Sequence, residues 1–163
     1  MIQSSNTGGY DPDSAKCRRF IYTNSAPNNL LVRMKFDATE CYPSLFLRHG
    51  TADVEGRNCY ALDLQPQNGT WQLSKQVEYA TTLLGSVKTQ TFTAGTWYWV
   101  RFTAIGTAIT GRIWEDGTAE PAAQSSVTDS TYAAAGYTGI RLGVGNAAES
   151  ARCFIDDLTI RAS

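Results

Sequence analysis

The chain is poor in charge and has no long apolar run. Only 18% of its 163 residues are charged and the formal net charge is −1, whereas nucleic-acid binding calls for a basic domain with clustered Lys and Arg. No apolar stretch approaches the roughly 20 residues of a transmembrane helix. The opening MIQSSNTGG also lacks the basic start and apolar core of a signal peptide. It stays open whether a signal peptide was removed or whether the chain is part of a longer polypeptide. We expect the protein neither to bind nucleic acid nor to insert into a membrane.

Cysteine and histidine are too sparse for zinc. Cys17, Cys41, Cys59 and Cys153 follow irregular spacings without a CxxC pair, and His49 is the only histidine. One or two disulfide bonds are an alternative, but the pattern favours reduced thiols in half-buried strands.

Calcium has one pair of candidate ligands. Asp11 and Asp13 supply oxygen atoms in the segment DPD, but no glycine and glutamate follow to complete a calcium loop. We therefore expect no cofactor, with calcium at these two residues as the open alternative.

The chain does contain many alternating apolar and polar segments. No segment sustains a 3.6-residue period, and turns rich in Gly, Asn, Asp and Pro separate about ten short strands. They are predicted at 30–38, 44–50, 59–65, 70–78, 82–92, 97–106, 108–114, 125–132, 139–145 and 152–162. The turn PQNG (66–69) suits a two-residue Asn-Gly hairpin. The pattern predicts an all-β chain, an antiparallel sandwich or barrel at residues 27–163, after an irregular segment 1–26 with a candidate edge strand at 17–23.

The stretch IWEDGTAEPA (113–122) is the first candidate for catalysis. A glycosidase needs two carboxyl groups across the scissile bond, and residues two or four apart share a strand face. Glu115 and Asp116 are adjacent and lead into Gly117, while Glu120 precedes Pro121, which favours extended loop. These three carboxylates therefore indicate a turn. Adjacent carboxylates in the last strand, at 156 and 157, are expected on opposite faces.

Aromatic residues give a second candidate site. If Tyr98, Val100 and Phe102 point into the core, the alternate residues of the same strand point outward. A short turn pairs this strand with 108–114, which adds outward residues from that strand. The shared outward set is Trp97, Trp99, Arg101, Thr110, Arg112 and Trp114. Tryptophan rings stack on the apolar faces of sugars and arginines donate to hydroxyls, so an exposed patch of this kind indicates a binding surface. Packing under a loop or another subunit is the alternative.

Several motifs in the second half of the chain resemble a known family. GTWYWVRF, GRIWEDGTAEPA, GIRLGVG and CFIDDLTI occur in this order and resemble the concanavalin A-like (laminin G-like) jelly-roll domains, most closely those of bacteriophage tail and other structural proteins. The resemblance covers residues 29–160 and is strongest from Gly95 onward. It implies an all-β fold, a two-sheet antiparallel jelly-roll sandwich of the concanavalin A-like lectin/glucanase type.

The resemblance also implies a function. Most members lack catalysis and bind carbohydrate or serve as adhesion units, and the E-x-D-x-x-E strand of the related glucanases is missing here. Trp97 and Trp114 fall on motif positions, which implies packing, so Trp99 is the stronger binding candidate.

We expect a non-enzymatic, lectin-like virion or tail module that contacts host-surface glycan or other virion proteins, with a homotrimer by analogy. The alternatives are a carbohydrate-binding module of a secreted bacterial glycosidase, which would be extracellular, and a structural virion assembly or decoration domain without a glycan ligand.

Overall fold

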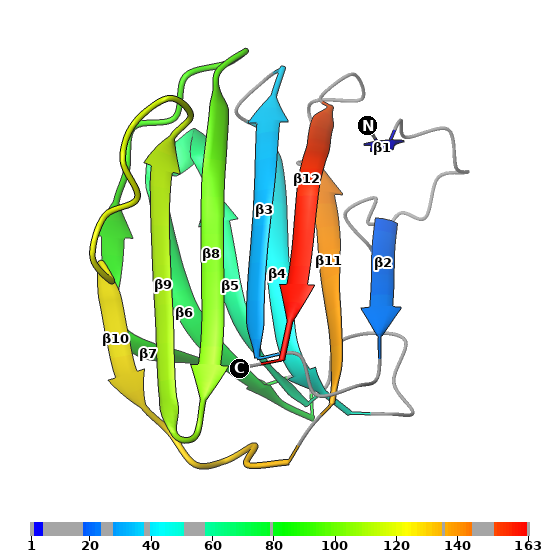
Figure 1. The fold of residues 1–163 in the computed structure, drawn as a ribbon, viewed down its shortest axis with the longest axis vertical. Coiled ribbons are helices and arrows are strands. Elements are labelled where there is room, and N and C mark those ends of the chain that lie inside the picture. Colours follow the sequence, from blue (N-terminus) through cyan, green and yellow to red (C-terminus); the bar gives the residue numbers. More distant parts are fainter. Residues whose placement is uncertain are drawn as a thin grey trace.

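Two antiparallel six-stranded sheets pack face to face in the computed structural model, which describes residues 2–4, 18–23, 28–37, 40–50, 58–78, 80–134, 136–144 and 152–162 (Figure 1). Sheet A contains, in spatial order, β1 (Ile2–Ser4), β12 (Cys153–Arg161), β3 (Asn29–Phe36), β8 (Trp97–Ile105), β9 (Ala108–Glu115) and β10 (Ser125–Thr128). Sheet B contains β2 (Arg18–Thr23), β11 (Tyr137–Val144), β4 (Cys41–His49), β5 (Cys59–Gln65), β6 (Thr70–Val77) and β7 (Ala80–Thr89). The predicted all-β, two-sheet antiparallel sandwich is confirmed.

Helical structure is almost absent from the described residues. They contain one short 3₁₀ turn, η1 (Pro66–Asn68), and no helix with the length and apolarity to cross a bilayer. η1 also corrects the predicted two-residue hairpin. The link between β5 and β6 spans four residues, with Gly69 in the left-handed region at φ 61° closing it.

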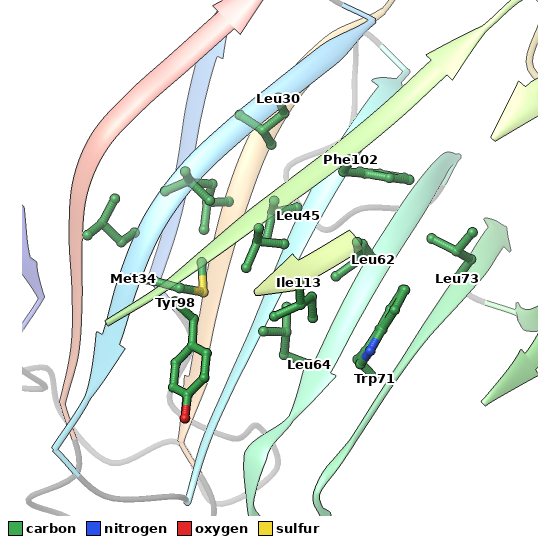
Figure 2. Packing of buried hydrophobic residues seen from close by; sticks show 14 of the residues in the cluster. Leu30, Met34, Leu45, Leu62, Leu64, Trp71, Leu73, Tyr98, Phe102 and Ile113 are labelled. Carbon is green, nitrogen blue, oxygen red and sulfur yellow. The ribbon is translucent and has the colours of Figure 1, made fainter. Parts of the chain in front are cut away.

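The core lies between the sheets, and period-two alternation produces it. In β3 and β8 every second residue is buried, so that Met34 and Tyr98 point toward sheet B (Figure 2). Sheet B meets them with Leu45, Leu62 and Trp71, which are at most 1% exposed. Because inward residues of β3, β8 and β9 are apolar, the alternate residues of these strands are left on the outer face of sheet A.

Gly111 brings the two sheets close together beneath that outer face. A Cβ at this position would lie 2.9 Å from Leu62 Cδ1, 2.9 Å from Trp71 Cζ3 and 3.1 Å from Leu73 Cδ2. Ordinary carbon contacts are about 3.5–4.0 Å. A glycine is therefore required where the Trp71 ring packs against β9.

A polar network joins the loop after β10 to sheet B. Asp129 accepts hydrogen bonds from Tyr60 Oη (2.7 Å), Lys75 Nζ (2.7 Å) and the Thr131 backbone N–H (2.8 Å). Burial would raise the pKa of Asp129, but these hydrogen bonds outweigh it and hold the pKa well below its ordinary value. The ionised carboxylate thus anchors the segment that crosses from one sheet to the other.

The last strand departs from the predicted alternation. A β-bulge follows Asp156 in its pairing with β3, and Asp157 has a positive φ of 47°. The bulge turns both carboxylates toward one side, where each lies near Arg33 (2.9 and 3.1 Å). The prediction that Asp156 and Asp157 lie on opposite faces is therefore wrong, because a bulge resets the side-chain period.

Candidate binding face

The outer face of sheet A places the predicted aromatic and arginine residues together. Trp99 pairs with Trp114 and Arg101 with Arg112 across β8 and β9. On the other side of β8, Arg33 of β3 pairs with Trp99. We call this surface the arginine–tryptophan face, and its members are Arg33, Trp97, Trp99, Arg101, Arg112 and Trp114.

One end of this face is a closely packed aromatic and cationic cluster. The Trp99 and Trp114 rings stack with centroids 6.3 Å apart and planes 17° apart. The Arg33 guanidinium lies over Trp97 (4.8 Å) and Trp99 (5.8 Å). Since β3 and β9 flank β8 on opposite sides (Figure 1), Trp99 lies between Arg33 and Trp114. Side chains therefore lie on both sides of the half-buried Trp99 ring.

Asp116 fixes the orientation of this cluster. Its carboxylate accepts from Trp99 Nε1 (2.7 Å) and Arg33 Nη1 (3.3 Å), and its own N–H donates to the Trp97 carbonyl (2.9 Å). Gly117, at φ 84°, permits the tight turn that folds Asp116 back over the sheet. The segment is a turn, as predicted, but one whose carboxylate reaches the arginine–tryptophan face.

Arg33 also forms ion pairs with Asp156 and Asp157 of β12. The hydrogen bond to Asp156, together with the charges of Asp157 and Asp116, raises the pKa of Arg33 despite partial desolvation. The same hydrogen bond lowers the pKa of Asp156. Lys35, over the Trp97 ring, is a second cation here, so Arg33 and Lys35 against three carboxylates leave one surplus negative charge at this end.

The opposite end of the face is an open pocket of about 390 Å³, within the roughly 300–1,000 Å³ of small-molecule sites. Its lining residues come from β3, β8, β9 and the segment after β9. They are Asn29, Arg101, Thr103, Ile105, Ala108, Thr110, Arg112 and Glu120. We call it the Arg101–Arg112 pocket. Its lining contains two hydroxyl and two guanidinium groups.

Hydrogen bonds inside the Arg101–Arg112 pocket fix its polar groups. Glu120 accepts from Arg101 Nε (2.7 Å) and Nη2 (3.0 Å) and from Arg112 Nη1 (3.0 Å). Thr103 and Thr110 share a hydrogen bond between their hydroxyls (2.6 Å). Arg101 Nη1 also donates to Asn29 Oδ1 (3.1 Å). The arginines are thus held in place with most of their side chains covered.

Sequence reasoning placed the arginines and tryptophans but missed the residues that complete the site. The glutamate-proline pair predicts an extended loop for Glu120, and no sequence motif points to Arg33, Asn29 or Thr103. The missing information is the pairing of β3 with β8, because it places Arg33 beside Trp99 and Asn29 beside Thr103, residues far apart in the sequence.

The remaining candidates are the possible calcium ligands and the cysteines. Asp11, Asp13 and Cys17 lie outside the described residues. Within that part of the chain no group of three or more His, Cys, Asp or Glu residues could hold a metal ion. Cys41 and Cys153 are free thiols in the core.

Comparison with known proteins places the fold. No family profile matches the sequence, and none of the curated proteins does. Solved structures do match. A carbohydrate-binding module, CBM66, from Bacillus subtilis superposes with a TM-score of 0.69 at 12% identity, covering 98% of this chain and 90% of that one. A tetrameric galectin from the ball sponge Cinachyrella has a TM-score of 0.54 at 10% identity, with 88% and 98% covered.

Enzymes share the same architecture. The β-glucanase of Bacillus licheniformis superposes with a TM-score of 0.56 at 14% identity, covering 88% of this chain and 70% of the enzyme. At these sequence identities the similarity establishes the fold alone, and the function has to be inferred from the site. The chain has the concanavalin A-like jelly-roll fold.

Proposed function

We propose that this protein is a non-catalytic, lectin-like module that binds carbohydrate in the Arg101–Arg112 pocket. The observation that carries the proposal is the pocket itself, where paired threonine hydroxyls lie beside two oriented guanidinium groups. Sugars present many hydroxyl groups, and a pocket with several convergent donors can satisfy them when water is displaced. The similarity to a carbohydrate-binding module and a galectin agrees with this choice.

The state of the carboxylates supports binding without hydrolysis. A glycosidase needs one carboxylic acid that stays protonated, which requires a raised pKa. On the arginine–tryptophan face Arg33 lowers the pKa of Asp156, and Glu120 is held by two arginines. The hydrogen bond from Arg33 favours the ionised form of Asp156, which cannot act as a general acid.

A threonine-to-valine exchange tests the proposal, since it removes a hydroxyl and keeps the branched shape. Affinity electrophoresis and calorimetry against a panel of soluble polysaccharides should detect a ligand for the wild type. Thr110→Val should then weaken that binding about tenfold, as expected for one or two lost hydrogen bonds. Thr128→Val, on the neighbouring β10 and outside the pocket, is the matched control and should bind like wild type. If no polysaccharide binds at millimolar sugar, the proposed function is refuted.

For the biological setting we propose a phage tail or virion surface, on the motif resemblance. There the module would meet host-surface glycan or other virion proteins. The similarity to CBM66 favours a second setting equally, a binding module of a secreted bacterial glycosidase. The two settings are distinguished by whether the neighbouring genes encode tail proteins or a hydrolase. Light scattering would test the homotrimer suggested by the first setting.

A further inference from the structure

We infer that the Arg101–Arg112 pocket recognises the carboxylate of an acidic sugar, a uronate, and that Glu120 occupies this position as an internal competitor in the unbound protein. This inference rests on the proposed function and names the ligand class of the same site. Its starting point is the charge arrangement around the two arginines.

Two guanidinium groups lie directly opposite each other on β8 and β9, where Arg101 pairs with Arg112. Like charges at directly paired positions destabilise a sheet unless an anion lies between them. The anion in this structure is the Glu120 carboxylate, which forms two hydrogen bonds with Arg101 and one with Arg112. The fork of donors on arginine matches the planar geometry of a carboxylate. The pair is therefore arranged for a carboxylate.

Glu120 does not neutralise the site. Two arginines and one glutamate leave one surplus positive charge in the pocket lining. The opposite end of the face, where Asp116, Asp156 and Asp157 lie near Arg33 and Lys35, carries one surplus negative charge. An acidic sugar would therefore orient with its carboxylate at the Arg101–Arg112 end, because the other end repels it.

The attachment of Glu120 is accessible to a ligand. It lies in the connection between β9 and β10, and its side chain is 33% exposed. The neighbouring Pro121 carbonyl accepts one bond from Arg112 Nη1 (3.2 Å). The side chains of Arg101, Arg112 and Glu120 are 22%, 24% and 33% exposed, so a ligand can reach the ion pairs from solvent. A ligand carboxylate can replace Glu120 by forming the same hydrogen bonds with Arg101 and Arg112, while the Thr103–Thr110 hydroxyl pair lines the same pocket.

The test is calorimetry with oligouronates of galacturonate, glucuronate and mannuronate, each compared with its carboxyl-reduced counterpart of identical linkage. Wild type should bind at least one acidic oligosaccharide about tenfold or more tightly than its reduced form, and this preference should fall in 0.5 M NaCl. Arg112→Gln should abolish the preference. Glu120→Gln should tighten acidic binding about 3- to 10-fold, because the competing charge is gone.

Glu115→Gln is the matched control, since it removes one negative charge from the same turn at an exposed position. It should leave the acid preference unchanged. If Glu120→Gln lowers the melting temperature too far for measurement, Glu120→Asp, one methylene shorter, should still tighten acidic binding. Equal binding of acidic and reduced sugars, or weaker acidic binding by both Glu120 variants, overturns the inference while leaving the proposed function intact. Absence of binding to any sugar, acidic or neutral, refutes the proposed function instead.

Discussion

Gly111→Ala should destabilise the protein by a predictable amount. The new methyl group would lie 2.9 Å from carbons of Leu62 and Trp71, so β9 or these side chains must move by about 0.5–1 Å to reach ordinary contact. Overpacking of this kind costs about 1–3 kcal/mol. The lower entropy of the unfolded alanine chain offsets about 0.4–1 kcal/mol. The net loss in the free energy of unfolding is then about 1–2 kcal/mol, or about 2–8 °C in melting temperature for a chain of this size.

Urea denaturation of a double-mutant cycle measures this effect. Leu62→Val removes one of the carbons in the clash and alone should cost about 1 kcal/mol. Combined with Gly111→Ala it should cost less than the sum of the two changes, by about 0.5 kcal/mol or more. Gly50→Ala is the control, since its Cβ would lie 3.7 Å from Asn58 Cβ, an ordinary contact. Wild-type stability for Gly111→Ala, or strict additivity with Leu62→Val, would refute the packing argument.

Three further predictions follow from the hydrogen bonds and the burial. Asp129→Asn should lower the free energy of unfolding by about 2 kcal/mol at pH 7. Because the folded pKa of Asp129 is depressed, wild type loses this advantage as pH falls below about 4. Urea titrations should therefore show the free energies of unfolding of the two proteins converging toward pH 2. Asp116→Ala removes the acceptor of Trp99 Nε1, so its indole N–H should exchange faster in NMR spectra, while an unchanged rate would contradict the contact. Burial raises the pKa of Cys41 to about 12 and that of Cys153 well above its usual value, so neither should be alkylated by iodoacetamide at pH 8 before denaturation, and peptide mass spectrometry would detect modification.

The sequence predicted the inward and outward sides of the strands because side-chain alternation is local. Tyr98, Val100 and Phe102 are buried as expected, and the short turn after Ile105 fixes the register of β8 with β9. That register brings the predicted tryptophans and arginines onto one face. These features depend on neighbouring residues and on a two-residue loop, which the sequence shows directly.

Features that depend on distant segments were not predictable in the same way. The bulge that brings Asp156 and Asp157 to one side breaks a period that sequence reasoning assumes to be regular. The role of Glu120 depends on how an irregular connection folds over the sheet, and its glutamate-proline pair indicates only extended backbone. A carboxylate in a turn and a carboxylate that bridges two arginines have the same sequence signature.

The fold is compatible with both binding and hydrolysis, since a binding module and a glucanase share it. The arginines favour binding. Arg33 lowers the pKa of Asp156, so that carboxylate is stabilised as an anion and is a poor proton donor. Arg101 and Arg112 together engage Glu120. The same guanidinium groups supply donors that a sugar carboxylate can use. If the face is catalytic instead, Arg33→Gln, which removes the shared partner of Asp116, Asp156 and Asp157, should raise the pKa of Asp156 and reveal glycan cleavage; we expect reducing-end assays to detect none for the wild type or the variant.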